Sequence, residues 1–526
     1  APNRENSAGF NLGDMQTVDH LLNQVQAAGG TPWSAQCLIP GAQPSGESVN
    51  VHSPADLGLL VGTYHRAAPA DVDLALNNAN QAFPAWRDRP VAYKSECLLK
   101  LADLLEENSA HLIYLLQNEA GKTLGDCVAE LREAVDFCRY YAYQAVDLCG
   151  HGEKMPGPTG ESNYLYHQGK GVFVCISPWN FPLAIYAGQV VAALVTGNCV
   201  IAKPAEQTSL IAHYTAQLIH QAGIPEAVFQ LVLGSGSQIG NPLCLANDIA
   251  GVVFTGSTQT AQIINQNLAS RKQAAIATLI AETGGQNCMV ADSSCLPEQL
   301  IKDVITSAFL SAGQRCSALR VLFIQEDVAD KVIAMLKGAM AELSVGNPQL
   351  FSTDLGPVID EKALGILNTH KARMEQLAKP IKALDKPNIN GHFFPPHAVE
   401  IAGMDVLEQE IFGPFLHVIR YQSTELDAVI DAINATGYGL TSGIHSRIDD
   451  TIEYIASRVQ AGNCYINRNM TGAVVGVQPF GGMGLSGTGP KAGGPGYLRQ
   501  FVTERTITNN ISAVGGNADL LELSDD

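Results

Sequence analysis

One cysteine stands in a segment whose residue types could support nucleophilic chemistry: Cys316, within SAGQRCSALR. Arg315 precedes it, and the backbone amides that follow can open toward the sulfur, so both could favour the reactive thiolate. A free cysteine in a globular protein is more often a buried packing residue. The assignment of Cys316 as a nucleophile therefore needs support from other segments.

Three other segments place polar residues after strand-like runs or inside a rigid turn. Glu282 begins ETGGQN, directly after the run ATLIA, and Lys203 and Glu206 belong to KPAE, after NCVIA. Asn180 lies in SPWNFP, a turn fixed by two prolines. Open α/β sheets gather functional groups beyond the carboxyl ends of their strands, so these side chains could meet around Cys316.

The elements that must position these residues alternate between helix and strand. Residues 70–145 show apolar residues at helical spacing. A Gly- and Pro-rich break at 151–162 precedes short apolar runs separated by helical segments, and a second such series extends from 299 to about 467. The pattern predicts two α/β domains joined near residues 283–300, each with a mostly parallel sheet covered on both faces.

Composition limits the function classes. The 526 residues carry a net charge of −19 without a basic block, which argues against binding nucleic acid or an anionic membrane. The most apolar long run, 187–203, is interrupted by polar residues and glycine, so no membrane span is expected. The 12 cysteines show no CxxC pair and no metal-like spacing with histidine, which predicts no metal site and free thiols in a reducing cytoplasm.

Seven ordered motifs carry a family resemblance. SPWNFP, KPAEQT, FTGST, ETGGQN, GQRCSA, EIFGPF and QPFGG together resemble the aldehyde dehydrogenase superfamily over roughly residues 50–505. The resemblance implies an α/β fold with a Rossmann-like NAD-binding domain, an α/β catalytic domain and a small β-flap. The implied segments are 1–155 with 172–284 for NAD binding, 285–484 for catalysis, and 156–171 with 485–526 for the flap, a substrate-anchor loop and the tail.

The resemblance also implies a role for each site residue. Cys316 is the nucleophile, Asn180 stabilises the oxyanion together with the backbone amide of Cys316, and Glu282 is the base that activates water for deacylation. The cofactor is NAD rather than NADP, because a carboxylate at Glu206 would repel a 2′-phosphate. The implied cofactor-binding residues are Ile176, Ser177, Pro178, Trp179, Lys203, Glu206, Gly256, Ser257, Thr283, Gly284, Glu410 and Phe412.

Longer stretches narrow the resemblance to one group. GEKMPGPTGESNYLYHQGKGVFVCISPWNFP and GLSGTGPKAGGPGYLRQF are similar to the dehydrogenases of proline catabolism, and most of all to the C-terminal half of the bifunctional flavoenzymes called proline utilisation A. That implies oxidation of L-glutamate γ-semialdehyde, in equilibrium with 1-pyrroline-5-carboxylate, to L-glutamate. The implied substrate-binding residues are Phe181 and Phe501 around the aliphatic part, Ser317, Gly493 and Gly494 toward the amino acid end, and Arg315 without an assigned part of the substrate.

Alternatives remain open at this stage. The chain could be an aldehyde dehydrogenase for another small or dicarboxylate semialdehyde, or a catalytically silent relative with a structural or binding role. We expect an excised domain or a stand-alone relative without FAD and without proline oxidation, because 526 residues leave no room for a second catalytic barrel. Residues 160–171 and the C-terminal region resemble a flap that pairs between subunits, so a homodimer is expected.

Overall fold

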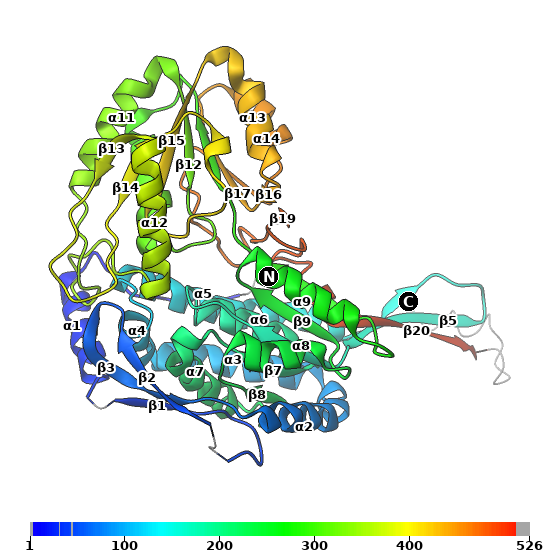
Figure 1. Ribbon diagram of the computed structural model, residues 1–526. Helices are drawn as coiled ribbons and strands as arrows, with labels where there is room; N and C mark the ends of the chain where they lie inside the picture. The colour runs from blue at the N-terminus through cyan, green and yellow to red at the C-terminus, as the bar shows by residue number, and fades with distance from the viewer. Residues whose placement is uncertain (1–3, 31, 44–45, 512–526) are drawn as a thin grey trace.

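The computed structural model describes residues 4–30, 32–43 and 46–511, which form two α/β lobes and a projecting arm (Figure 1). One lobe contains a five-stranded sheet and the other a seven-stranded sheet. The α/β class predicted from the alternation of strands and helices is therefore confirmed. The part of the predicted C-terminal tail beyond residue 511 lies outside the described residues.

The five-stranded sheet has the order β10-β9-β6-β7-β8, and every neighbouring pair is parallel. Its strands are β6 Val172–Ile176, β7 Cys199–Lys203, β8 Phe229–Leu231, β9 Gly251–Thr255 and β10 Thr278–Glu282. Their residues are mostly buried, because helices cover both faces of a parallel sheet, and the strands accordingly read as continuous apolar runs in the sequence.

Nine helices surround this sheet within the described ranges. They are α1 Met15–Ala27, α2 Pro69–Arg87, α3 Val91–Glu107, α4 Ser109–Asn118, α5 Leu124–Cys149, α6 Ala184–Val195, α7 Ser209–Gln221, α8 Asn241–Leu245 and α9 Thr258–Ser270. Helices α2 and α6 contact β6 and β7, and the long helix α5 packs on α3, α4 and α6. A small sheet of β1 Trp33–Ala35, β2 Ser48–Ser53 and β3 Asp56–His65 flanks the lobe.

The seven-stranded sheet has the order β13-β14-β15-β12-β11-β17-β18, with β13 antiparallel to β14 and the other pairs parallel. Its strands are β11 Cys288–Ala291, β12 Val321–Gln325, β13 Lys379–Ala383, β14 His397–Glu400, β15 Phe415–Tyr421, β17 Thr441–His445 and β18 Asn463–Ile466. The chain passes between the two sheets at residues 283–287, inside the predicted joint, whereas the outer domain boundaries and the functions assigned to the domains stay predictions.

Side-chain alternation places a separate core on each face of this second sheet. Met289 and Ala291 pack in one cluster with Leu300 of α10 and Leu336 of α11, while Cys288 packs in another. Successive strand residues point to opposite faces, so helices are needed on both sides. The helices are α10 Pro297–Phe309, α11 Glu326–Ala341, α12 Glu361–Leu377, α13 Leu426–Ala435 and α14 Asp449–Arg458.

A three-stranded antiparallel sheet forms the arm that extends from the body in Figure 1. Strand β5 Glu161–Gly169 lies between β4 Glu153–Met155 and β20 Val502–Asn510, and pairs with β20 along its whole length. The arm coincides with the predicted flap, whose pairing between subunits stays a prediction. A two-residue pair, β16 Tyr438–Gly439 with β19 Met483–Gly484, lies near the lobe junction. Within the described ranges, no helix has the length and apolar character that a bilayer crossing requires.

Candidate active site

A cavity of about 600 Å³ lies between the two lobes. Helix α5, Phe181 and the strand end at Glu282 line it from one lobe, and residues 306–317 and 468–480 line it from the other. Cys316 lies in its wall. The candidate nucleophile and the candidate base, distant in sequence, therefore face one space at an interface between lobes, where ligand sites commonly occur.

The backbone just before Cys316 adopts a rare conformation. In the short 3-10 helix Leu310–Gly313, Ser311, Ala312 and Gly313 have φ values of 55°, 52° and 65°. Glycine is needed at 313, because a Cβ there would lie 2.2 Å from the carbonyl oxygen of Gly413. Two non-glycine residues at positive φ cost free energy, so the surrounding structure must hold this loop in place.

Two side chains that the sequence analysis did not select hold the loop. The Asn287 amide donates to the carbonyl oxygens of Cys316 (2.6 Å) and Ala318 (2.9 Å). The buried Arg320 guanidinium donates to the carbonyls of Gly313 (2.7 Å) and Arg315 (2.9 Å). Asn287 is the last residue of ETGGQN and Arg320 the last of SAGQRCSALR, and each directly precedes an apolar run. A polar residue next to a strand-like apolar run was therefore the signal that could have identified them.

The expectation that Arg315 promotes the thiolate was wrong. Its guanidinium is engaged by Asp126 (2.8 Å) and by Ser311 Oγ (2.9 Å), and it is not among the groups acting most strongly on the thiol. Burial, together with Glu410 and Glu282, raises the pKa of Cys316 to about 12. The Ser317 backbone amide and Arg320 lower that pKa, so the expected contribution of a following amide is present but is outweighed by burial.

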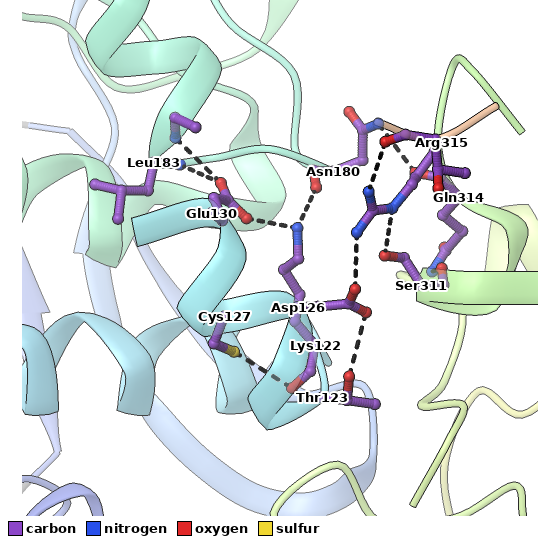
Figure 2. A network of polar contacts seen from close by, with 12 residues as sticks. Lys122, Thr123, Asp126, Cys127, Glu130, Asn180, Leu183, Ser311, Gln314 and Arg315 are labelled. Atoms are coloured by element: carbon purple, nitrogen blue, oxygen red, sulfur yellow. Dashed lines mark hydrogen bonds and ion pairs between the residues drawn. The ribbon is translucent and has the colours of Figure 1, made fainter. Parts of the chain in front are cut away.

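Asn180 lies in the turn that follows β6, close to the nucleophile loop (Figure 2). Its side-chain nitrogen donates to the carbonyl oxygen of Gln314, 3.0 Å away and two residues before Cys316. An amide nitrogen carries two hydrogens, so one N–H group remains for a ligand oxygen. This placement agrees with an oxyanion donor, although that role stays a prediction.

A buried ion pair holds the turn that carries Asn180 (Figure 2). Lys122 Nζ donates to the backbone carbonyl of Asn180 (2.8 Å) and to Glu130 Oε2 (2.5 Å), and both charged side chains are at most 5% exposed. The other oxygen of Glu130 accepts from the amides of Leu183 (2.9 Å) and Ala184 (3.2 Å). Lys122, in the loop before α5, thus holds the start of the turn at Asn180, and Glu130, in α5, holds its end at Leu183 and Ala184.

Glu282 ends β10 and faces the cavity with only part of its hydrogen-bonding capacity used. Its Oε2 accepts from the Gly482 amide (3.1 Å), whereas its Oε1 is buried with no partner among the residues that the structure describes. Burial raises the pKa of this carboxyl to about 8, opposed by the Gly482 amide and by Lys491. A buried, partly unsatisfied carboxylate beside a thiol is suited to take a proton from water.

The ionisation of Glu282 predicts the pH dependence of turnover. A general base works only when deprotonated, so raising the pH through about 8 should increase kcat as the carboxylate forms. Initial rates at saturating substrate and cofactor between pH 6 and 10 would measure this limb, and Glu282→Gln should abolish it. A flat profile over that range would contradict the assignment of Glu282 as the base.

The predicted cofactor residues gather at one edge of the first sheet. Ile176, Ser177, Pro178 and Trp179 lie at the end of β6, Lys203 and Glu206 follow from β7, Gly256 and Ser257 from β9, and Thr283 and Gly284 from β10. These strands are parallel neighbours, so their carboxyl ends lie together. Ser257 caps α9 by accepting from the Thr260 amide (3.2 Å).

Glu410 and Phe412 reach this edge from the second lobe. The Phe412 ring meets Trp179 edge to face with centroids 5.6 Å apart, and Arg320 donates to Glu410 (3.2 Å). A Cβ at Gly284 would lie 1.7 Å from Glu410 Oε2, so glycine is required where the two lobes approach. The structure thus brings both groups of predicted cofactor residues together, and their roles stay predictions.

Unsatisfied polar atoms at this edge fit a polar ligand. Ser177 Oγ is buried without a partner in the described part of the chain. Lys203 is buried, its ammonium donates to the carbonyl of Pro204 (3.0 Å), and burial lowers its pKa to about 8. Buried donors of this kind cost free energy until a ligand pairs with them. The residues present therefore fit a nicotinamide dinucleotide with ribose hydroxyls and a pyrophosphate.

Three of the predicted substrate residues lie in the cavity wall, and three do not. Phe181, Arg315 and Ser317 line the cavity. Phe501 is fully buried against Phe173 and Tyr497, with ring centroids 5.1 and 5.3 Å apart, and is absent from the wall. The nearby wall is formed instead by Ala492 and Tyr497, which the sequence analysis did not select.

The two predicted anchor amides are occupied by internal hydrogen bonds. Gly493 N–H donates to Tyr141 Oη (2.7 Å), and Gly494 N–H donates to the Lys491 carbonyl (3.0 Å). Neither glycine belongs to the cavity wall. The structure therefore does not present these amides to a substrate carboxylate as the sequence analysis expected, because Tyr141 of α5 and a tight turn have already satisfied them.

Acidic residues on α5 were also missed. Asp126, Glu130, Glu133 and Asp136 share one face of this helix and line the cavity. Burial and the neighbouring Glu130 raise the pKa of Glu133 to about 7. Acids recurring every three or four residues inside an apolar helix were the signal that could have revealed them. In the described ranges, no cluster of three or more histidine, cysteine or acidic side chains could hold a metal ion.

Comparison with known proteins identifies the family. A family model described as "Aldehyde dehydrogenase family" matches residues 42–507. The chain belongs to this family. Among aldehyde dehydrogenases, "Bifunctional protein PutA" of Klebsiella aerogenes is 45% identical over 511 residues, which cover 95% of this chain and 38% of that protein. "1-pyrroline-5-carboxylate dehydrogenase 1" of Halalkalibacterium halodurans is 33% identical over 468 residues, covering 88% of this chain and 90% of that protein.

Solved aldehyde dehydrogenase structures share the whole fold. A variant of Bradyrhizobium japonicum Proline Utilization A matches with a TM-score of 0.89 and 51% identity, covering 98% of this chain and 49% of that one. A Thermus thermophilus 1-pyrroline-5-carboxylate dehydrogenase matches with a TM-score of 0.92 and 29% identity over 96% of this chain and 99% of that one. The predicted aldehyde dehydrogenase fold is confirmed, and the chain spans 38% of the Klebsiella protein and 49% of the Bradyrhizobium one.

Proposed function

We propose that this chain oxidises L-glutamate γ-semialdehyde, formed from 1-pyrroline-5-carboxylate, to L-glutamate with NAD as the oxidant. The observation that carries the proposal is the single cavity in which Cys316 and Glu282 lie beside the turn of Asn180. The relatives named above supply the substrate: proteins called 1-pyrroline-5-carboxylate dehydrogenase match over nearly their full length.

The residues present suit a covalent route. The Cys316 thiol gives up its proton to water as the sulfur bonds to the aldehyde carbon, and the carbonyl oxygen becomes an oxyanion that accepts from Asn180 Nδ2 and the Cys316 backbone amide. Loss of a hydride from that carbon leaves a thioester. Glu282 then takes a proton from water, the water oxygen bonds to the thioester carbon, and the C–S bond breaks to release the carboxylate and the thiol.

The cofactor site proposed here lies at the shared edge of β6, β7, β9 and β10. NAD bound there would supply the acceptor for the hydride. Lys203 and Glu206 would hold the adenosine ribose, Gly256 and Ser257 would receive the pyrophosphate at the start of α9, and Glu410 would hold the other ribose. The Glu206 carboxylate would repel the 2′-phosphate of NADP, so the rate with NAD should exceed the rate with NADP at equal concentrations. Glu206→Gln should lower the ratio of the two rates.

The amino acid end of the substrate requires partners for both of its charges. Ser317 offers a hydroxyl donor to the carboxylate, and Phe181 covers the aliphatic chain from the cavity wall. Glu133 is the acid we assign to the ammonium group, since it faces the cavity and a neighbouring cation would stabilise its charged form.

Replacing Glu133 with glutamine should separate recognition from chemistry. Loss of a charged hydrogen-bond partner should raise KM for the semialdehyde about tenfold or more, while KM for propanal, which lacks an ammonium group, should change little. Steady-state rates with both aldehydes measure the effect, and Glu107→Gln, on the exposed end of α3, is the matched control. Equal changes for the two aldehydes would remove Glu133 from the substrate site.

Formation of NADH, followed at 340 nm, tests the function directly. The semialdehyde should give a higher kcat/KM than succinic semialdehyde, glutaraldehyde or propanal. Preference for another semialdehyde would support an aldehyde dehydrogenase of different specificity, and no NADH with any aldehyde would support a catalytically silent relative. We also propose a homodimer built through the β4–β5–β20 arm, which light scattering of the whole chain would test.

A further inference from the structure

One peptide group supplies the hydrogen bond that holds the candidate base. Glu282 Oε2 accepts from the Gly482 amide at 3.1 Å, while Oε1 has no partner within the described ranges. The carbonyl oxygen of Gly481 belongs to the same peptide group as that amide. Whatever binds the Gly481 carbonyl therefore acts directly on the group that donates to Glu282.

Lys491 binds that carbonyl from the other side. Its ammonium donates to the carbonyl oxygens of Gly481 (2.5 Å) and Gly462 (2.5 Å) and to Asn463 Oδ1 (2.9 Å). Three acceptors match the three hydrogens of the ammonium, so the side chain is fixed rather than free to rotate. Asn463 Oδ1 also accepts from the Gly481 amide (3.4 Å), which ties the segment to β18.

The segment must be glycine to approach the base this closely. A Cβ at Gly481 would lie 2.7 Å from Glu282 Oε1, and a Cβ at Gly482 would lie 2.6 Å from the Ser486 Cβ. Contacts under about 3 Å would displace either the carboxylate or the loop. The glycine pair of QPFGG therefore has a specific purpose here: it lets a peptide plane stand between the ammonium and the carboxylate.

We propose that Lys491 is a positioning residue for the general base: through the Gly481–Gly482 peptide its ammonium fixes Glu282 and strengthens the amide that donates to the working carboxylate. A cation that donates to a peptide carbonyl polarises the whole peptide and makes its N–H group a better donor. The inference rests on the proposed function, because it assigns Glu282 to the hydrolysis of the thioester.

The other charged and titratable groups around Glu282 do not replace Lys491. Cys316 and Tyr497 interact electrostatically with Glu282. Burial raises the pKa of both groups, so both are neutral near pH 8. Lys491 is the cation whose charge lowers the pKa of Glu282. The acid–base behaviour of Glu282 should therefore respond to the charge at position 491 more than to any of these neighbours.

Three lysine variants separate charge from packing. Lys491→Gln keeps a donor to the Gly481 carbonyl without the charge, Lys491→Arg keeps the charge, and Lys170→Gln is the matched control. Lys170 is half-buried, and its ammonium donates to Thr278 Oγ1 (2.9 Å) and the Gln500 carbonyl (2.8 Å), so it contacts the far end of the strand that Glu282 terminates.

The readout is the pH profile of kcat with the semialdehyde and the pre-steady-state release of NADH. In Lys491→Gln the midpoint of the rising limb should move up by about one pH unit, with kcat at pH 7 lowered about tenfold. Since hydride loss precedes thioester hydrolysis, slower hydrolysis should expose a burst of NADH equal to the number of active sites. Lys491→Arg should restore most of the midpoint, and Lys170→Gln should match the unmodified enzyme.

Distinct outcomes would overturn the inference. An unchanged midpoint without a burst in an active Lys491→Gln enzyme would show that the ammonium does not act on the base. A Lys491→Gln enzyme with an unchanged melting temperature that shows neither a burst nor turnover would also contradict the proposal. That result would place Lys491 in the formation of the adduct. If Lys491→Gln fails to fold, the kcat–pH profile of Lys491→Arg decides. A midpoint equal to that of the unmodified enzyme supports the proposal. A midpoint displaced upward by about one pH unit, despite the retained charge, contradicts it. An unmodified enzyme that forms no NADH would instead refute the proposed function.

Discussion

Replacing Cys316 with alanine is expected to lower kcat for NADH formation by roughly 10⁴-fold or more, the scale seen when a covalent nucleophile is removed from an enzyme. The bond between sulfur and the aldehyde carbon is the first step of the proposed route, and the other side chains of the cavity cannot substitute for it. Initial rates with the semialdehyde measure the loss, and NAD binding followed by protein fluorescence should be preserved.

A second cysteine provides the matched control for this prediction. Cys464, in β18, is exposed, whereas Cys316 lies in the cavity wall. Cys464→Ala should keep full activity, and iodoacetamide should inactivate the Cys464→Ala enzyme and the unmodified enzyme at equal rates. Substantial NADH formation by Cys316→Ala would contradict the covalent mechanism and leave the cavity as a binding site of another kind.

The candidate catalytic residues could be selected from the sequence because they lie in short motifs. Cys316, Glu282 and Asn180 each lie within a few residues of a strand end or a proline-fixed turn, and such positions are defined locally. The strands were predictable for a related reason: both sheets are covered on both faces, so their strands appear as apolar runs without alternation. Local sequence was therefore sufficient for the elements and for selecting three residues that the structure brings close together, while the catalytic roles of these residues stay predictions.

The substrate anchor was not predictable, because its outcome depends on a distant partner. The amide of Gly493 can face a ligand or fold back, and Tyr141, which lies 352 residues earlier in the chain, takes it at 2.7 Å. Similarly, the choice between Arg315 and Arg320 as the cation that acts on Cys316 depends on Asp126, which engages Arg315 from α5. Spacing within a motif contains no information about such long-range partners.

The buried pair Lys122–Glu130 should contribute most to stability among the charged contacts of the site. Glu130→Ala is expected to lower the free energy of unfolding by about 3 to 5 kcal/mol, because it leaves the Lys122 ammonium without its partner inside the protein. It also removes the acceptor of the Leu183 and Ala184 amides. Urea denaturation followed by circular dichroism measures the change.

Two comparisons test the origin of that loss. Asp330 pairs with Arg420, and its side chain is 93% exposed, so Asp330→Ala should cost at most about 1 kcal/mol. The double variant Lys122→Met with Glu130→Gln keeps a carbonyl acceptor for the two amides and buries no charge, so it should recover most of the stability. A double variant as unstable as Glu130→Ala would show that the lost charge is not the cause.

The same double variant distinguishes stability from catalysis. Lys122 donates to the Asn180 carbonyl, and its ammonium lies 4.2 Å from the centroid of the Phe181 ring. Without that donor, the turn loses the contact that fixes the predicted oxyanion donor beside Gln314. We therefore expect a fully folded double variant with kcat lowered about tenfold or more and KM nearly unchanged, since an oxyanion donor acts in the transition state rather than in substrate binding. An unchanged kcat in that folded variant would mean that the ion pair stabilises the fold without positioning Asn180.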